Sequence, residues 1–209
     1  MARKKLKEKG EYRRLDYFQL MEVTLRELLT EKGILAPGQV DAEVENMRSR
    51  TPERGARVVA KAWVNEEFRR KLLENGTQAC QELGLDVPAL KLVVVENTPE
   101  VHNAIVCTLC SCYPRMLLGI PPDWYKSRAY RSRMVREPRK VLQEFGLKIK
   151  KGTAVRVHDS TADMRYLVLP MRPAGTEGWS EEKLAALVTR DSMIGVAVPK
   201  VPRSKSTRK

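Results

Sequence analysis

Three of the four cysteines in this chain, Cys107, Cys110 and Cys112, lie within six residues of one another. A thiolate is both the nucleophilic and the metal-binding form of cysteine, so three of them this close without a metal would repel one another and invite oxidation. The cluster therefore predicts a metal site. The fourth cysteine, Cys80, lies among apolar residues far away in the sequence, and we interpret it as a buried, inert thiol.

Three kinds of metal site remain open on residue types alone. A structural zinc site normally takes four ligands from two spaced pairs. This chain has no second cysteine pair, and its only histidines are His102 and His158, so a zinc site would be incomplete. An iron–sulfur cluster would need Cys80 as its fourth ligand. In the third kind, the peptide nitrogens of Ser111 and Cys112 join the three sulfurs around a strongly polarising trivalent ion. That arrangement fills five positions of an octahedron and leaves one for water or substrate.

The elements around the cysteines predict an α+β fold. Apolar residues recur every three or four positions from Leu15 to Lys32, which predicts an amphipathic helix that ends at Gly33. Further helices follow up to Gly84. Apolar runs then predict strands around residues 92–95, 104–106 and 166–169, and the alternation of Val155 and Val157 with polar residues predicts another around 155–157. The cysteines follow the second of these strands, at its carboxyl end.

We expect an N-terminal helical arm followed by a layered α/β/β/α-like domain that carries the metal loop. The expected boundaries are a basic tail at 1–14, a helical arm at 15–53, a metal-binding catalytic domain at 54–198 and a second basic tail at 199–209. The arm has little core of its own, so we expect its apolar stripe to pack on a partner subunit.

The net charge of +13 is concentrated at the ends of the 209-residue chain, where residues 1–14 and 199–209 each carry +5. Basic ends are typical of solvated or partner-docking tails, so we expect no nucleic-acid partner. No apolar run reaches the roughly 18 residues of a membrane span, and the amino terminus leads into no apolar signal core. We expect a protein without a membrane partner, located in the cytoplasm, as clustered rather than spaced cysteines also indicate.

A second basic cluster follows the cysteines directly and contains three aromatic residues. The aromatic residues would suit base stacking, but the position beside the cysteine loop favours a subunit interface or a site wall. Because base stacking stays open, a zinc-binding, basic nucleic-acid module is the rival class of function. The cluster consists of Trp124, Tyr125, Lys126, Arg128, Tyr130, Arg131, Arg133, Arg136 and Arg139.

The motif from Val106 to Tyr113 resembles the metal-binding signature of the nitrile hydratase alpha subunit, in its cobalt form. The resemblance extends over about residues 56–198. It includes the segments 96–103, 119–125, 130–133, 135–139, 169–176 and 188–196.

The resemblance implies a cobalt(III) ion, with iron(III) as the alternative, bound by the sulfurs of Cys107, Cys110 and Cys112 and by the main-chain nitrogens of Ser111 and Cys112. It implies oxidation of Cys110 to a sulfinate and of Cys112 to a sulfenate. The family hydrates small nitriles to amides. The catalytic nucleophile would be the Cys112 sulfenate, or a water activated by that sulfenate or by the metal. It also implies a beta subunit, in a heterodimer or a dimer of heterodimers, and an activator protein that loads cobalt.

One departure from the family pattern raises a second function. Nitrile hydratases typically have a tryptophan shortly after Tyr113, where this chain has Arg115. The gamma subunit of thiocyanate hydrolase, which converts thiocyanate to carbonyl sulfide and ammonia, resembles this chain at that position. An arginine suits an anionic substrate. We therefore expect Tyr113 and Arg115 to line the substrate pocket, with a surface or interface position as the alternative for Arg115. The resemblance makes Thr108 and Tyr113 markers of the cobalt type.

Six further polar residues are secondary candidates. His102 and His158 would serve as proton relays or as ordinary hydrogen-bonded residues. Glu96 and Asp159 belong with them, and Arg172 and Arg190 would tie the site region or the subunits together.

Overall fold

The computed structural model describes residues 16–87 and 91–202, which divide into two compact units between Met47 and Arg48. The predicted tail at 1–14 and most of the predicted tail at 199–209 lie outside the described residues. No helix in the described ranges combines the length and the hydrophobicity that crossing a membrane requires.

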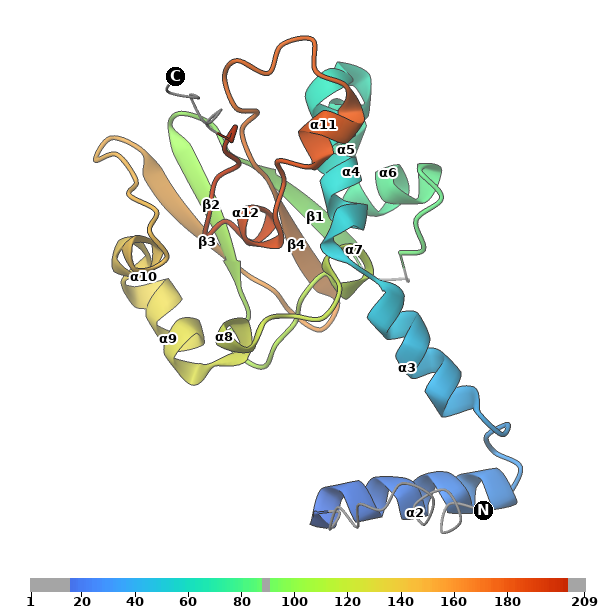
Figure 1. The fold of residues 1–209 in the computed structure, drawn as a ribbon. Coiled ribbons are helices and arrows are strands. Elements are labelled where there is room, and N and C mark those ends of the chain that lie inside the picture. Colours follow the sequence, from blue (N-terminus) through green and yellow to red (C-terminus); the bar gives the residue numbers. More distant parts are fainter. Residues whose placement is uncertain (1–15, 88–90, 203–209) are drawn as a thin grey trace, which may run out of the picture. The chain divides into compact units, whose positions relative to one another are not determined.

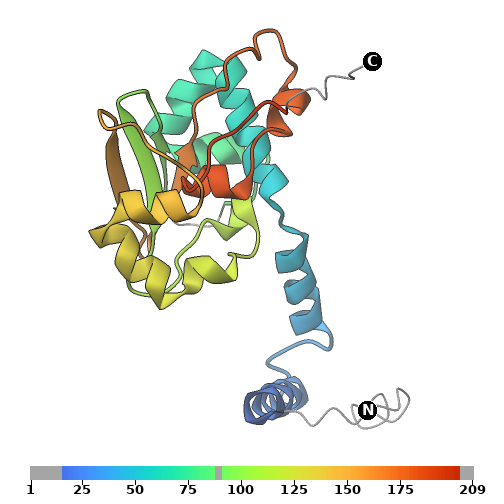
Figure 2. The same cartoon turned by 60° about the vertical axis from the view of Figure 1, so that its left-hand side comes forward.

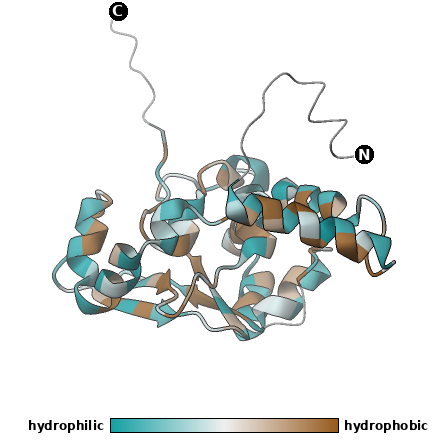
Figure 3. Cartoon of the chain, turned by 90° about the horizontal axis from the view of Figure 1, so that it is seen from below, coloured by the Kyte–Doolittle hydropathy of each residue, from teal (hydrophilic) through white to brown (hydrophobic). Residues whose placement is uncertain are grey.

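The first unit contains helix α2 (Tyr17–Glu31) and most of helix α3 (Gln39–Ser49). Asp16 starts α2 because its carboxylate accepts a hydrogen bond from the Gln19 backbone N–H at 2.8 Å, completing a capping box. The predicted helix is therefore present. None of its residues is buried, and Phe18 remains 77% exposed. Figure 3 shows hydrophobic residues, in brown, along this exposed helix.

Three helices open the second unit: α4 (Pro52–Val64), α5 (Glu66–Glu74) and α6 (Gly76–Glu82). Asn65 begins α5 by accepting a hydrogen bond from the Phe68 N–H at 2.8 Å. Val58 and Val59 of α4 are completely buried in the core. Cys80 is also completely buried, and burial raises the pKa of its thiol to about 12, as an inert cysteine requires.

Four strands form two parallel pairs in the second unit. β1 (Lys91–Glu96) pairs with β4 (Met164–Leu169), and β2 (Val101–Val106) pairs with β3 (Ala154–Asp159). Helices α5 and α6 contact β1, α9 contacts β2 and α10 contacts β3. Buried parallel strands have continuous apolar runs, as β1 and β4 do, whereas β3 alternates exposed and half-buried residues.

Six further helices lie in the described part of the unit (Figure 1). In Figures 1 and 2 the yellow helices α8 to α10 and the cyan helices α4 to α6 form two separate groups. The helices are α7 (Arg115–Leu118), α8 (Asp123–Lys126), α9 (Arg128–Arg136), α10 (Pro138–Glu144), α11 (Glu181–Ala185) and α12 (Arg190–Ile194). The helices and small sheets confirm the predicted α+β class.

Candidate metal centre

The cysteine loop begins where β2 ends, and β3 ends beside it. In the parallel register Val106 lies opposite Asp159, and the Ser160 N–H donates to the Val106 carbonyl at 2.8 Å. The Asp159 carboxylate then accepts two hydrogen bonds from Thr108, one from its backbone N–H at 2.9 Å and one from its hydroxyl at 2.5 Å. The paired strands therefore fix the start of the loop, as a rigid support for a site must.

The three cysteine sulfurs converge at the end of this support. The Cys110 Sγ lies 3.5 Å from the Cys107 Sγ and 3.2 Å from the Cys112 Sγ. All three sulfurs lie within 4.8 Å of one another, and all three thiols are free. Two sulfurs bound at about 2.3 Å to one ion, at a right angle, would be about 3.3 Å apart. The sulfur positions therefore fit a shared metal ion.

The peptide groups of the loop also point to the sulfurs. Hydrogen bonds from the Cys112 and Cys107 side chains, together with smaller contributions from the backbone N–H groups of Ser111 and Cys112, lower the pKa of Cys110 to about 7. Burial and the hydrogen bond to Cys110 instead raise the pKa of Cys112 to about 12. The loop thus stabilises negative charge at Cys110 first, and a cation that binds here must displace the remaining thiol protons.

Exposure differs sharply among the three thiols. Cys107 is completely buried, Cys112 is partly buried and Cys110 is exposed. Cys110 and Cys112 are therefore more accessible to small oxidants than Cys107 is.

A cavity of about 350 Å³ opens beside Cys110, Ser111 and Cys112. The predicted pocket residues Tyr113 and Arg115 both line it. Met116 and two further arginines, Arg50 and Arg165, complete its wall. The charge of Arg165 lowers the pKa of Cys112 against the larger effect of burial.

Gly119 explains how Arg50 comes to this wall. The backbone of Gly119 has φ +69°, which favours glycine, and a Cβ atom there would collide with the Arg50 carbonyl. The close approach places the segment before α4 against the end of α7, which begins at Arg115. Glycine at this position therefore lets two of the three arginines share one cavity.

Tyr113 and Tyr125 lie together under the loop. Their rings meet edge to face with centroids 5.1 Å apart, and the Tyr125 hydroxyl donates to the Cys112 carbonyl at 2.9 Å. The Tyr113 hydroxyl is buried and has no hydrogen-bond partner within the described residues. Burial raises the pKa of both phenols, so both are neutral donors at neutral pH.

Arg131 holds the loop from α9. Its Nη1 donates to the Cys110 carbonyl at 2.8 Å. Sequence reasoning placed Arg131 only in a basic cluster and missed this contact, as it missed the contact of Tyr125. The aromatic residues of the cluster are turned inward: Tyr125 and Tyr130 are buried, and the Trp124 ring packs against Tyr130 with centroids 4.9 Å apart.

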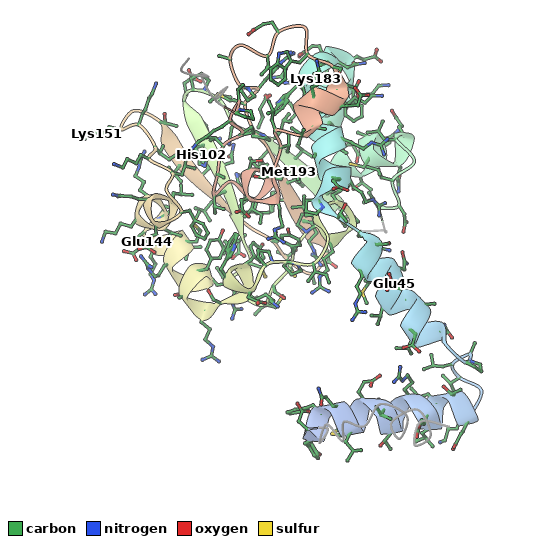
Figure 4. All side chains as sticks on the ribbon, in the orientation of Figure 1. Glu45, His102, Glu144, Lys151, Lys183 and Met193 are labelled. Carbon is green, nitrogen blue, oxygen red and sulfur yellow. The ribbon has the colours of Figure 1, made fainter. Side chains whose placement is uncertain are left out.

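The two histidines are held in hydrogen-bond networks away from the sulfurs. His102 Nε2 donates to the Gly195 carbonyl at 2.7 Å, and His158 Nε2 donates to the Asn103 amide oxygen at 2.8 Å. Figure 4 labels His102 on β2. Burial lowers the pKa of both histidines, so both are neutral at neutral pH. Asn103 also joins β2 to the Glu96 carbonyl.

The other secondary candidates make structural contacts. Glu96 forms a two-pronged ion pair with Arg69, with donor–acceptor distances of 2.7 and 2.6 Å. Arg172 donates to the Trp63 carbonyl at 3.2 Å and to Thr176. Arg190 lies 3.4 Å from the Ile120 carbonyl. Of the six secondary candidates, Asp159 is the one that the structure brings into direct contact with the cysteine loop.

Comparison with known proteins identifies the family of this chain. Residues 16–197 match the family model described as "Nitrile hydratase, alpha chain". The nitrile hydratase subunit alpha of a Rhodococcus species is 53% identical over 181 residues, covering 85% of this chain and 91% of the relative. The cobalt-containing subunit alpha of Pseudonocardia thermophila is 52% identical, covering 82% and 86%. The thiocyanate hydrolase subunit gamma of Thiobacillus thioparus is 42% identical, covering 88% and 80%.

Solved structures agree with this placement. A double mutant of the Fe-type nitrile hydratase of Comamonas testosteroni Ni1 has a TM-score of 0.81 and 43% identity, with coverage of 90% of this chain and 93% of that one. A recombinant thiocyanate hydrolase with partially modified cobalt centres has a TM-score of 0.83 and 40% identity, with coverage of 93% and 99%. The predicted resemblance and the prediction of an enzyme subunit are confirmed: this chain belongs to the nitrile hydratase alpha chain family.

Proposed function

We propose that this chain is the metal-carrying alpha subunit of a heteromeric nitrile hydratase, which hydrates nitriles to amides at a non-corrin cobalt(III) ion. One observation carries the proposal: three cysteine sulfurs and two peptide N–H groups converge at the edge of a cavity. Cobalt is named for the Pseudonocardia relative, and an Fe-type neighbour makes iron(III) the alternative ion.

The proposed ligands are the sulfurs of Cys107, Cys110 and Cys112 and the amide nitrogens of Ser111 and Cys112. Soft thiolates suit a transition metal. When bound, the ion supplies Lewis-acid polarisation of the substrate's carbon–nitrogen triple bond. We propose that Cys110 is oxidised to a sulfinate and Cys112 to a sulfenate. The exposure of Cys110 and Cys112, and the complete burial of Cys107, support that selectivity.

Cys112 is the proposed catalytic residue because it lies at the cavity that substrate would enter. Its sulfenate oxygen, or a water molecule that this oxygen activates, delivers oxygen to the nitrile carbon. The net reaction adds one water to the triple bond, with the oxygen on carbon and both hydrogens on nitrogen. Tyr113 and Met116 form part of the cavity wall and limit the space beside Cys112.

The chain acts with a beta subunit in this proposal, and an activator protein loads the metal. The exposed apolar stripe of α2 supports a partner, since Phe18 and Leu25 are 77% and 56% exposed. We assign residues 15–53 to an arm that packs on the partner and residues 54–198 to the catalytic domain.

A specific observation favours thiocyanate hydrolase as the second candidate. Arg115 lines the cavity together with Arg50 and Arg165. Three guanidinium groups around one cavity favour an anion such as thiocyanate, whereas a neutral nitrile does not require them. In that case the chain would be the gamma subunit, and the products would be carbonyl sulfide and ammonia.

Co-expression with the cognate partner subunit and activator tests both functions. The complex is assayed in parallel on a simple aliphatic nitrile and on thiocyanate, and its metal content is measured after dialysis. The expected result is non-dialysable cobalt, nitrile turnover and a mass gain of three oxygen atoms on the peptide with Cys110 and Cys112. Turnover of thiocyanate alone would select the second candidate, and zinc with unoxidised cysteines would reject both.

A further inference from the structure

A second cavity, of about 660 Å³, lies against the same loop. Thr108 and Leu109 line one side of it, and one face of α9 lines the other. We call it the α9 groove and define it by Leu109, Arg128, Arg131, Val135 and Arg136. It differs from the substrate cavity because none of the three cysteines lines it.

The arginines of α9 divide into two groups. Arg133 is neutralised by its own chain, since it lies 2.5 Å from a Glu137 oxygen and 2.6 Å from a Glu144 oxygen. Arg128, Arg131 and Arg136, in contrast, have no carboxylate partner within the described residues. The groove therefore presents three positive charges that the described part of the chain does not balance.

Arg131 links the groove to the metal loop. One of its nitrogens, Nη1, donates to the Cys110 carbonyl at 2.8 Å. Its Nε is buried and has no hydrogen-bond partner within residues 16–87 and 91–202. An unpaired buried donor is costly, so a carboxylate brought to this side of the guanidinium would satisfy it.

The centre of the groove is apolar. Leu109 is 86% exposed at the tip of the cysteine loop, and Val135 is 47% exposed on α9. An apolar centre with arginines around it is typical of protein interfaces, where arginine is enriched. Single-stranded nucleic acid would instead need exposed aromatic rings for stacking, and Tyr130 of this helix is only 5% exposed.

We propose that the α9 groove is the docking site for an acidic segment of the beta subunit. An apolar side chain of that segment covers Leu109 and Val135, and its carboxylates pair with Arg128, Arg131 and Arg136. The proposal rests on the proposed function because it takes the beta subunit as the partner. Docking there completes the hydrogen bonds of the arginine that holds Cys110, so assembly and loop geometry are coupled.

Binding of the full chain to its cognate beta subunit tests this proposal. The double charge reversal R128E/R136E is compared with wild type and with the control R70E/K151E. The control makes the same change in net charge at two exposed cations that have no ion pair in the described part of the chain. We expect R128E/R136E to weaken binding about 30-fold or more and to reduce its salt dependence, since an interfacial charge left unpaired is costly. The control should bind like wild type.

Two further measurements keep a folding defect apart from a binding defect. Thermal unfolding of the isolated chain checks that R128E/R136E still folds, and V135D provides an independent variant expected to weaken binding without altering the arginines. A photo-crosslinking residue at Val135 should join the chain to an acidic peptide of the beta subunit. A crosslink to a segment without Asp or Glu would overturn the proposal.

Other outcomes reassign the groove. Equal affinity of R128E/R136E and R70E/K151E for the beta subunit overturns the proposal, while nitrile turnover by that complex leaves the proposed function standing. The docking proposal would also be overturned if the chain bound a random RNA oligonucleotide in a salt-sensitive way, or self-associated, and only R128E/R136E abolished that binding. If R128E/R136E binds the beta subunit more weakly but the wild-type complex hydrates no nitrile, the docking site is supported and the proposed nitrile hydratase function is rejected.

Discussion

The carboxylate of Asp159 accepts two hydrogen bonds from Thr108, one from its backbone N–H at 2.9 Å and one from its hydroxyl at 2.5 Å. Asp159 is the last residue of β3, and Thr108 is the residue after the first cysteine of the loop. Because both hydrogen bonds are to one carboxylate, they fix the direction in which the chain leaves β2. The geometry of the three sulfurs therefore depends on a residue 52 positions after Cys107 in the sequence.

Asp159→Asn should weaken metal retention. An amide can accept a hydrogen bond from only one of the two Thr108 donors, so the loop loses part of its support. Loss of such a supporting contact around a metal site typically lowers metal affinity roughly 10–100-fold. The measurement is cobalt per complex after dialysis against a chelator, with Asp163→Asn, an exposed side chain on the neighbouring turn, as control. Equal retention in both variants would show that Asp159 does not support the loop.

Tyr125→Phe and Tyr130→Phe form a matched pair. Each removes one hydroxyl, which donates to the Cys112 carbonyl at 2.9 Å in one case and to the Ile105 carbonyl at 2.7 Å in the other. Each loss should destabilise the chain by about 1–2 kcal/mol because a buried or partly buried carbonyl loses its donor. Only Tyr125→Phe should also lower cobalt retention, since Cys112 is a proposed ligand. Chemical denaturation and metal analysis together separate the two effects, and equal retention would contradict the assignment.

The strands and caps were predictable because their signals are local. The four consecutive apolar residues from Leu92 to Val95 indicate a strand without any tertiary information, and Asn65 before two glutamates is typical of a helix start. The boundaries found for β1 and α5 follow those signals. Helix α9 was not predicted, because five of its nine residues are arginine or serine on exposed or half-exposed faces and only Tyr130 and Met134 are buried. Two buried positions are too few to reveal a helical period.

The site was predictable only in part for a similar reason. The cysteines, Tyr113 and Arg115 are consecutive or nearly so, and the structure brings them to one cavity. Arg50 and Arg165 reach that cavity from far apart in the sequence, and no local pattern marks either of them. The contact of Arg131 with the Cys110 carbonyl depends on the orientation of α9 against the loop. Contacts of this kind are decided by tertiary packing.

Arg115→Gln should discriminate between the two candidate substrates. Removal of a cation from the wall of the cavity takes away a charge-assisted contact, worth about 1.5–3 kcal/mol, that only an anion would use. We expect kcat/KM for thiocyanate to fall about tenfold or more, whereas kcat/KM for a neutral nitrile stays within about threefold. Arg70→Gln, on the exposed surface of α5, is the control. A parallel fall for both substrates would assign Arg115 to packing or assembly.

Acidification should destabilise the isolated chain through His102. Burial lowers the pKa of His102 in the folded protein, so the unfolded chain, with a histidine pKa of about 6.5, takes up its proton first. The stability due to neutral His102 is therefore complete above about pH 6.5 and is lost as the pH falls toward the lower pKa of the folded state. Urea unfolding at several pH values between about 7.5 and 5.5 measures the slope. His102→Gln should reduce that slope, and an unchanged slope would contradict the interpretation.

Charge placed on the apolar stripe of α2 should affect assembly and leave folding intact. Met21 and Leu25 are 51% and 56% exposed, and no residue of the helix is buried in the isolated chain. The double variant M21E/L25E therefore removes little buried surface, and its melting temperature should match wild type within about 2 °C, as surface substitutions usually do. In the complex the same side chains would be covered, so burial of two carboxylates should weaken binding to the beta subunit at least tenfold, roughly. Sedimentation analysis measures the affinity, and E22Q/E27Q on the same helix is the control. Normal assembly of M21E/L25E would show that the arm does not pack on the partner through this stripe.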